Sequence, residues 1–164
     1  MWIRIVLFAI ALGPAVAVAD PAGKSLEKDF GVGLAIGVAS GPNLQFKPTS
    51  HDAHIDLGFG IGSLHAMRFQ ADYAWRLYYF SRDRSSVVPL YVGGGAYFTD
   101  RTWGADVGVR IPIGVQAEFA EVPVQLFGEI SPEAIVYEHI ARDVMAPGRD
   151  RFTLRAMMGA RATF

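Results

Sequence analysis

The side chains that could support acid–base or nucleophilic chemistry are few. The sequence has four histidines and no cysteine, which excludes thiol nucleophiles, thiolate metal ligands, disulfides and a lipid-modified N-terminal cysteine. Ser63 and His65 share one short turn, but a serine hydrolase also needs an acid that orients the histidine. No serine lies in a Gly-x-Ser-x-Gly motif. We therefore expect no catalytic residue, with a lipid-modifying hydrolase built on Ser63 and His65 as an alternative.

Candidate metal ligands gather at one place in the sequence. His51, Asp52, His54 and Asp56 lie within six residues. Alternation along a strand puts His54 and Asp56 on one face, whereas His51 falls in the preceding turn. This arrangement does not supply a convergent ligand set, so we expect neither a metal nor any other cofactor.

A larger group of charged residues alternates with apolar residues. Between Asp106 and Phe119 every odd-numbered residue is apolar, whereas the even-numbered residues are charged, polar or small. A period of two also runs over residues 67–79 and 152–164. This period is typical of β-strands, in which successive side chains point to opposite faces. The strands therefore have one apolar face and one polar face.

Clusters of turn-forming residues divide the chain into eight candidate strands. They cover residues 31–39, 43–49, 53–62, 66–80, 87–99, 104–119, 123–138 and 151–164. An even number of strands places both chain termini on one side of the barrel, as in bacterial outer-membrane barrels. Pro112 and Pro132 each lack a backbone donor, so each is predicted to mark a bulge or bend.

The charged residues of the polar face are predicted to form a network inside the barrel. Its candidate members are Arg68, Asp72, Arg76, Asp106, Arg110, Glu118, Glu129, Arg155 and Arg161. Charge at this density cannot form an oily core, so the apolar face is expected to point outward, as in a transmembrane barrel. Several segments exceed the roughly 9–11 residues that a tilted strand needs to cross the hydrocarbon. The sequence thus favours an eight-stranded antiparallel transmembrane β-barrel over a soluble periplasmic one.

The predicted network closes the lumen. An eight-stranded barrel is just wide enough inside for side chains, so its arginines and carboxylates are expected to pair. Gly108 and Gly114 leave space beside Arg110, whose guanidinium is predicted to bind Glu129 on the neighbouring strand. Such pairs act first as structure and second as a gate. A narrow pore for ions or small solutes is the alternative.

The N-terminal residues are predicted to direct export. Residues 1–19 combine a positive charge at Arg4, an apolar stretch and the sequence Ala17-Val18-Ala19, as in a cleaved secretory signal peptide. Residues 20–30 are predicted to be a flexible periplasmic leader. The barrel would then occupy residues 31–164, in the outer membrane.

The aromatic residues favour the same location. The chain ends in Phe164 at the end of an alternating strand, a form typical of the insertion signal of outer-membrane barrels. Further aromatic residues, among them Tyr91 and Tyr97, lie near predicted strand ends, where interfacial aromatic girdles are expected.

The charge balance limits the possible partners. The formal net charge is -1, and without a basic cluster nucleic acid is excluded as a partner. The expected partners are outer-membrane lipid, lipopolysaccharide and the barrel-insertion machinery. A further, unknown surface ligand would meet the long external segment 139–150, because loops on rigid scaffolds carry recognition. The candidate contact residues there are Arg142, Asp143, Arg149 and Asp150.

Several motifs together resemble those of a known family. They are Gly31-Val32-Gly33-Leu34, Asp72-Tyr73-Ala74-Trp75, residues 89–95 and 159–164, a Gly-x-Arg-x-Pro-x-Gly motif at 108–114 and a Phe-x-Glu-x-x-Pro motif at 127–132. Across almost the whole mature chain the sequence resembles the small OmpA/OmpX-like eight-stranded outer-membrane barrels of proteobacteria and spirochaetes. The resemblance implies a location and a fold, and it carries no catalytic residues.

Overall fold

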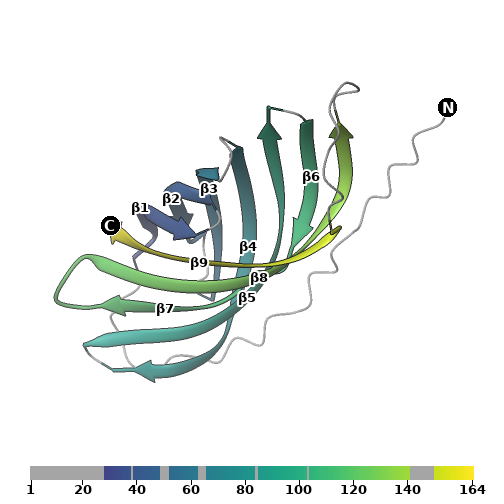
Figure 1. The fold of residues 1–164 in the computed structure, drawn as a ribbon. Helices are drawn as coiled ribbons and strands as arrows, with labels where there is room; N and C mark the ends of the chain where they lie inside the picture. Colours follow the sequence, from purple (N-terminus) through teal and green to yellow (C-terminus); the bar gives the residue numbers. More distant parts are fainter. Residues whose placement is uncertain are drawn as a thin grey trace.

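A computed structural model describes residues 28–37, 39–48, 52–62, 66–83, 85–102, 104–140 and 150–164. These residues form one all-β domain (Figure 1). Its strands are β1 (Phe30–Gly37), β2 (Ala39–Phe46), β3 (Ala53–Gly62), β4 (Met67–Arg82), β5 (Ser86–Arg101), β6 (Gly104–Arg110), β7 (Ile113–Phe119), β8 (Val124–Ile140) and β9 (Phe152–Thr163). Over this part of the chain, no helix has the length and apolar character needed to span a membrane. The predicted signal peptide 1–19 lies outside the described residues, as does the leader up to residue 27.

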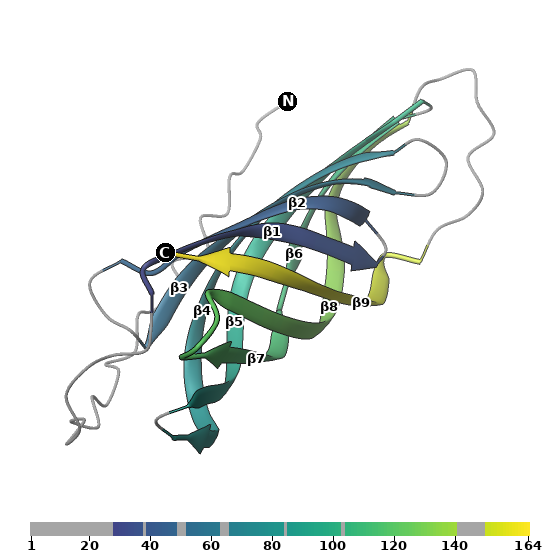
Figure 2. The ribbon, with the colours of Figure 1, turned by 90° about the vertical axis from the view of Figure 1, so that its left-hand side faces the viewer.

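The strands close into an antiparallel ring. Each strand from β1 to β5 pairs with the next, β8 pairs with β9, and β9 pairs with β1. Figure 2 shows β1 between β2 and β9. The backbone N–H of Phe164 donates to the carbonyl of Phe30 at 2.9 Å, so the ring begins and ends on the same side. The predicted all-β antiparallel barrel is therefore confirmed as a fold, with eight strand positions in the ring.

Strands β6 and β7 together occupy one position of the ring, between β5 and β8. β5 pairs with both, and so does β8. The gap between them is Ile111-Pro112, inside the predicted strand 104–119. The predicted irregularity at Pro112 is therefore confirmed.

The break in this strand has a cause in two prolines. Gly93 donates its N–H to the carbonyl of Pro112 at 2.8 Å, and Ile111 donates to the carbonyl of Pro132 at 3.0 Å. In an antiparallel ladder every second opposed pair exchanges two such bonds. Both prolines occupy pairs of this kind, but neither has an N–H to return. Two adjacent pairs thus keep one ladder bond each. At Pro132 the irregularity lies on one side of β8: the pairing with β9 continues through it, whereas the pairing with β6 and β7 is interrupted between Glu133 and Ile130.

The first hairpin also differs from the prediction. Strand β2 begins at Ala39 instead of residue 43, and Gly41 and Pro42 pair with β1 instead of forming a turn. A Cβ added to Gly41 would lie 2.9 Å from the Cα of Gly60 on β3. Glycine here allows two strands to approach closely, which a turn-based interpretation of the sequence misses.

The barrel has its polar side chains inside and its apolar side chains outside. Outward-facing apolar residues remain exposed, for example Leu34 at 67% and Met158 at 60%. The buried charged residues, by contrast, include Arg68, Asp72 and Glu118. A soluble barrel has the opposite arrangement. The interior of this barrel is therefore a polar core.

Candidate functional site

One end of the barrel is the end where Phe30 and Phe164 meet, and we call it the terminal end. There, the interior side chains gather around one carboxylate. Glu118 on β7 accepts from Lys47 Nζ at 2.8 Å and from Arg76 Nη2 at 2.7 Å, both through Oε1. Gln125 on β8 donates to the same oxygen at 2.8 Å. All of these side chains are buried. A buried carboxylate needs such partners to offset the loss of its hydration.

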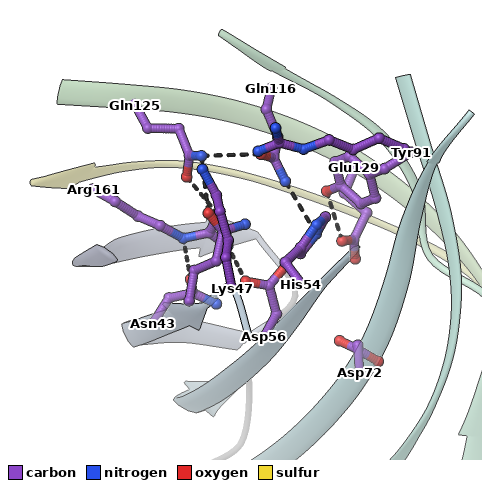
Figure 3. A network of polar contacts seen from close by, with 12 residues as sticks. Asn43, Lys47, His54, Asp56, Asp72, Tyr91, Gln116, Gln125, Glu129 and Arg161 are labelled. Carbon is purple, nitrogen blue, oxygen red and sulfur yellow. Dashed lines mark hydrogen bonds and ion pairs between the residues drawn. The ribbon is translucent and has the colours of Figure 1, made fainter. Parts of the chain in front are cut away.

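Amide side chains extend this group across the lumen (Figure 3). Gln125 Nε2 lies 2.9 Å from the Oε1 atoms of both Gln45 and Gln116. The amide nitrogen of Gln116 lies 3.0 Å from His54 Nε2, and the His54 ring packs edge-on against Tyr91 with centroids 5.1 Å apart. These residues come from β2, β3, β5, β7 and β8, so the network ties several walls of the barrel together.

Arg161 joins the last strand to this group. Its Nε donates to Asn43 Oδ1 at 2.5 Å, its Nη1 to Gln125 Oε1 at 2.7 Å, and its Nη2 lies 3.0 Å from Asp56 Oδ1. The guanidinium also lies over the ring of Phe127, 3.9 Å from its centroid. The planar guanidinium of arginine holds several N–H donors in fixed directions, so it satisfies these separate acceptors better than a lysine ammonium group would.

A second group of side chains surrounds Arg110. Its Nη2 pairs with Glu129, as the sequence predicted. Its Nε donates to Ser131 Oγ at 3.1 Å, and its Nη1 lies 3.4 Å from Asp72 Oδ2. Tyr91 donates its hydroxyl to Glu129 Oε2 at 3.0 Å. One guanidinium thus serves two carboxylates from different strands.

Glu133 is a central residue that the sequence analysis missed. Arg68 Nη2 lies 2.5 Å from its Oε1, and Arg155 Nε lies 2.7 Å from its Oε2. Arg110 Nε is 3.8 Å from the same carboxylate. The available signal was its position on β8, an even number of residues from Glu129, which puts both on the same face.

The nine predicted network residues all lie inside the barrel, in separate groups. Arg76, Glu118 and Arg161 belong to the terminal end, whereas Asp106 pairs with Arg101. Arg155 is the least buried, with 20% of its side chain exposed. The sequence indicated the inward face of these residues but not how they group.

Two of the aromatic residues that were predicted to lie in an interfacial girdle face the interior instead. Tyr91 and Tyr97 are 1% and 5% exposed and point into the lumen. Arg68 lies over the Tyr97 ring, 4.0 Å from its centroid. Both tyrosines occupy odd positions on β5, where the inward face is odd-numbered. The prediction of an interfacial location was wrong because it used nearness to a strand end and not the face.

Two small cavities lie among the inward-facing side chains. A cavity of about 20 Å³ is bordered by Arg68, Glu133 and Arg155, and a second of about 10 Å³ is bordered by Asn43 and Arg68. A cavity of roughly this size holds about one water molecule. Around these residues, side chains leave room for no more than about one water molecule in each cavity.

Several predicted residues lie outside the part of the chain that the structure describes: Ser63, His65, Arg142, Asp143 and Arg149. Asp150 is described and exposed, and Phe164 is 71% exposed at the end of the chain. Within the described ranges, no group of three or more histidine, aspartate or glutamate side chains could hold a metal ion.

Comparisons of the chain with protein-family models, with curated proteins and with solved structures gave no match. Its class is defined by its own geometry. It is a closed antiparallel β-barrel with an apolar outer wall and a core of buried ion pairs.

Proposed function

We propose that this chain is a small integral β-barrel of the bacterial outer membrane, with a structural or surface-interaction role and no enzymatic activity. The observation that carries this proposal is the reversed arrangement of the wall, apolar outside and charged inside. A bilayer requires every backbone polar group to be satisfied within the protein, which a closed ring of strands achieves. The sequence of residues 1–19 supports export.

The outward-facing aromatic residues support this location. Phe30 and Phe46 are directly paired near the terminal end of the barrel. Toward the opposite end, Phe59, Phe69 and Phe98 occupy one continuous row of paired positions. Aromatic residues are typical of the two interfaces of a membrane barrel. The apolar wall between these rows would face hydrocarbon.

The buried ion pairs of the interior favour a structural barrel over a pore. Ion pairs join strands that are distant in sequence, as between Lys47 and Glu118 or Arg68 and Glu133. Opening a water path would require ion pairs of this kind, which are buried between strands, to separate. A recognition role would then belong to the predicted external segment 139–150, through outer-membrane glycolipid or an unknown surface ligand.

The proposal is tested with the mature chain refolded into phosphatidylcholine vesicles. A closed barrel is expected to migrate faster on a gel before heating than after heating, and its core is expected to resist protease in the vesicles. Planar-bilayer recordings are expected to show no steady conductance. A protein that stays in the aqueous phase would refute membrane insertion, whereas discrete stable openings would refute the closed lumen and favour the narrow pore.

A further inference from the structure

One ring nitrogen of His54 faces two side chains that require opposite things of it. His54 is fully buried, with 0% of its surface exposed. Its Nε2 lies 3.0 Å from the amide nitrogen of Gln116 and 3.3 Å from Asp56 Oδ2. An amide N–H needs a lone pair on the ring nitrogen, whereas a carboxylate needs a proton there. The position of the proton on the ring therefore decides which of the two side chains His54 binds.

The orientation of the Gln116 amide is fixed by two arginines. Gln116 Oε1 accepts from Gln125 Nε2 at 2.9 Å and from Arg76 Nη2 at 3.5 Å. A guanidinium donates only, so the Gln116 oxygen must face Arg76. Gln125 is oriented in the same way, because Arg161 Nη1 donates to its Oε1 at 2.7 Å. Figure 3 shows the Gln116 side chain between Gln125 and His54, with its nitrogen toward the ring.

This amide donor fixes the proton of the neutral His54 ring. Nε2 must offer its lone pair to Gln116, so the proton lies on Nδ1. A second proton would place an N–H on Nε2, directly against the amide donor of Gln116. The ring can then bind Asp56 but no longer Gln116. The two protonation states of His54 thus require different hydrogen bonds.

The charged side chains around the ring are already paired. Asp56 binds Arg161, Glu118 binds Lys47 and Arg76, and Arg110 binds both Asp72 and Glu129. A second proton on His54 would therefore add a positive charge where each of these carboxylates already has a cation. The titratable or charged groups around the ring are Lys47 on β2, Asp56 on β3, Asp72 and Arg76 on β4, Tyr91 on β5, Glu118 on β7, Glu129 on β8 and Arg161 on β9.

We propose that His54 is a pH-sensitive switch in the polar core of the barrel. With a neutral ring, His54 accepts from Gln116 and ties β3 to β7. With a protonated ring, Nε2 donates to Asp56 and Gln116 loses its acceptor. Gln125 donates to both Gln116 and Glu118, so the change reaches the carboxylate at the terminal end. Histidine changes its charge between about pH 5 and 8, which makes acid the signal.

The first test is urea unfolding of the full mature protein in dodecylphosphocholine micelles, at about pH 8 and about pH 5. The variant is His54→Gln, whose amide can accept from Gln116 and donate to Asp56 without titrating. An unfolded chain protonates its histidines near about pH 6.5. Below that pH, the unfolding equilibrium constant of wild type is expected to rise relative to that of His54→Gln, by up to about tenfold per pH unit. The matched control is His139→Gln, which is expected to follow wild type because His139 is exposed.

The second test reads the proton directly by nitrogen-15 NMR of histidine-labelled protein. At about pH 8 the His54 ring is expected to carry its proton on Nδ1, and its signals are identified by their loss in His54→Gln. Gln116→Met removes the amide donor, so the proton is expected to move to Nε2, where it can bind Asp56. This variant keeps the proposal testable if His54→Gln does not fold.

Three results would overturn the switch. The first is a proton on Nε2 of wild type at about pH 8, and the second is an unchanged ring in Gln116→Met. The third is a wild-type barrel that responds to acid as His54→Gln does, or that gains stability relative to it. Both measurements need a folded barrel and no bilayer, so their outcome is independent of the proposed membrane location.

Discussion

Asp56 and Asp72 lie directly opposite each other on β3 and β4, yet their carboxylates bind different arginines. Asp56 Oδ1 is 3.0 Å from Arg161, and Asp72 Oδ2 is 3.4 Å from Arg110. Like charges in directly opposed positions destabilise a strand pair. Each aspartate therefore needs its own cation, and this pair marks the boundary between the two large groups of the interior.

The two aspartates are expected to differ in their effect on stability. Asp56→Asn leaves the buried Arg161 without a carboxylate and is predicted to lower the free energy of unfolding by about 3 kcal/mol. Asp72→Asn leaves Arg110 paired with Glu129 and removes a like-charge neighbour of Asp56, so a loss below about 1 kcal/mol is expected. Denaturant unfolding followed by tryptophan fluorescence measures both. Equal losses would contradict this account of the boundary.

Arg110 is predicted to be the most sensitive residue of the second group. Arg110→Met removes the cation shared by Glu129 and Asp72 and is expected to destabilise the barrel by about 3–5 kcal/mol. Arg110→Lys keeps the charge but loses the fork, so a smaller loss is expected. The control is Arg151→Met, because Arg151 is exposed. The same denaturant titration would count against a shared cation if Arg110→Met fell within about 0.5 kcal/mol of this control.

The two prolines at the break between β6 and β7 are predicted to weaken the ladder without setting the fold. In the double variant Pro112→Ala and Pro132→Ala, each new N–H can return a bond to its paired residue. Each added bond is expected to stabilise by about 0.5–1.5 kcal/mol. Hydrogen exchange should show slower exchange at Ile111 and Gly93. Faster exchange there, or a less stable barrel, would mean that the break relieves strain in the curved wall.

Two glycines on neighbouring strands provide a matched test of packing. Gly114→Ala places a methyl group against the Tyr91 ring and is expected to cost about 1–3 kcal/mol. Gly128→Ala meets no atom within 4 Å and is expected to leave stability unchanged or slightly higher, because alanine restricts the unfolded chain. Thermal unfolding of the two variants beside wild type measures the difference. A larger loss for Gly128→Ala would reverse the roles assigned to these positions.

Much of the fold was predictable because its signal is local. A strand places neighbouring residues on opposite faces, so Asp106, Arg110 and Glu118 were assigned to one face from sequence alone. The irregularity at Pro112 followed from a missing donor. The effect of Pro132 on the neighbouring strand could not be predicted in this way. The N–H that Pro132 lacks would have donated to Ile111, and only the register identifies Ile111 as the opposed residue.

The partners of the charged residues depend on the whole ring. Lys47 and Glu118 are 71 positions apart in the chain, and they meet because the register of every intervening strand brings them to the same level. Glu133 joins Arg68 to Arg155 for the same reason. The sequence alone determined a barrel with an apolar wall and a charged interior, since a period of two is a property of neighbouring residues. Only the tertiary structure decided which charges pair, since the pairing depends on contacts between distant strands.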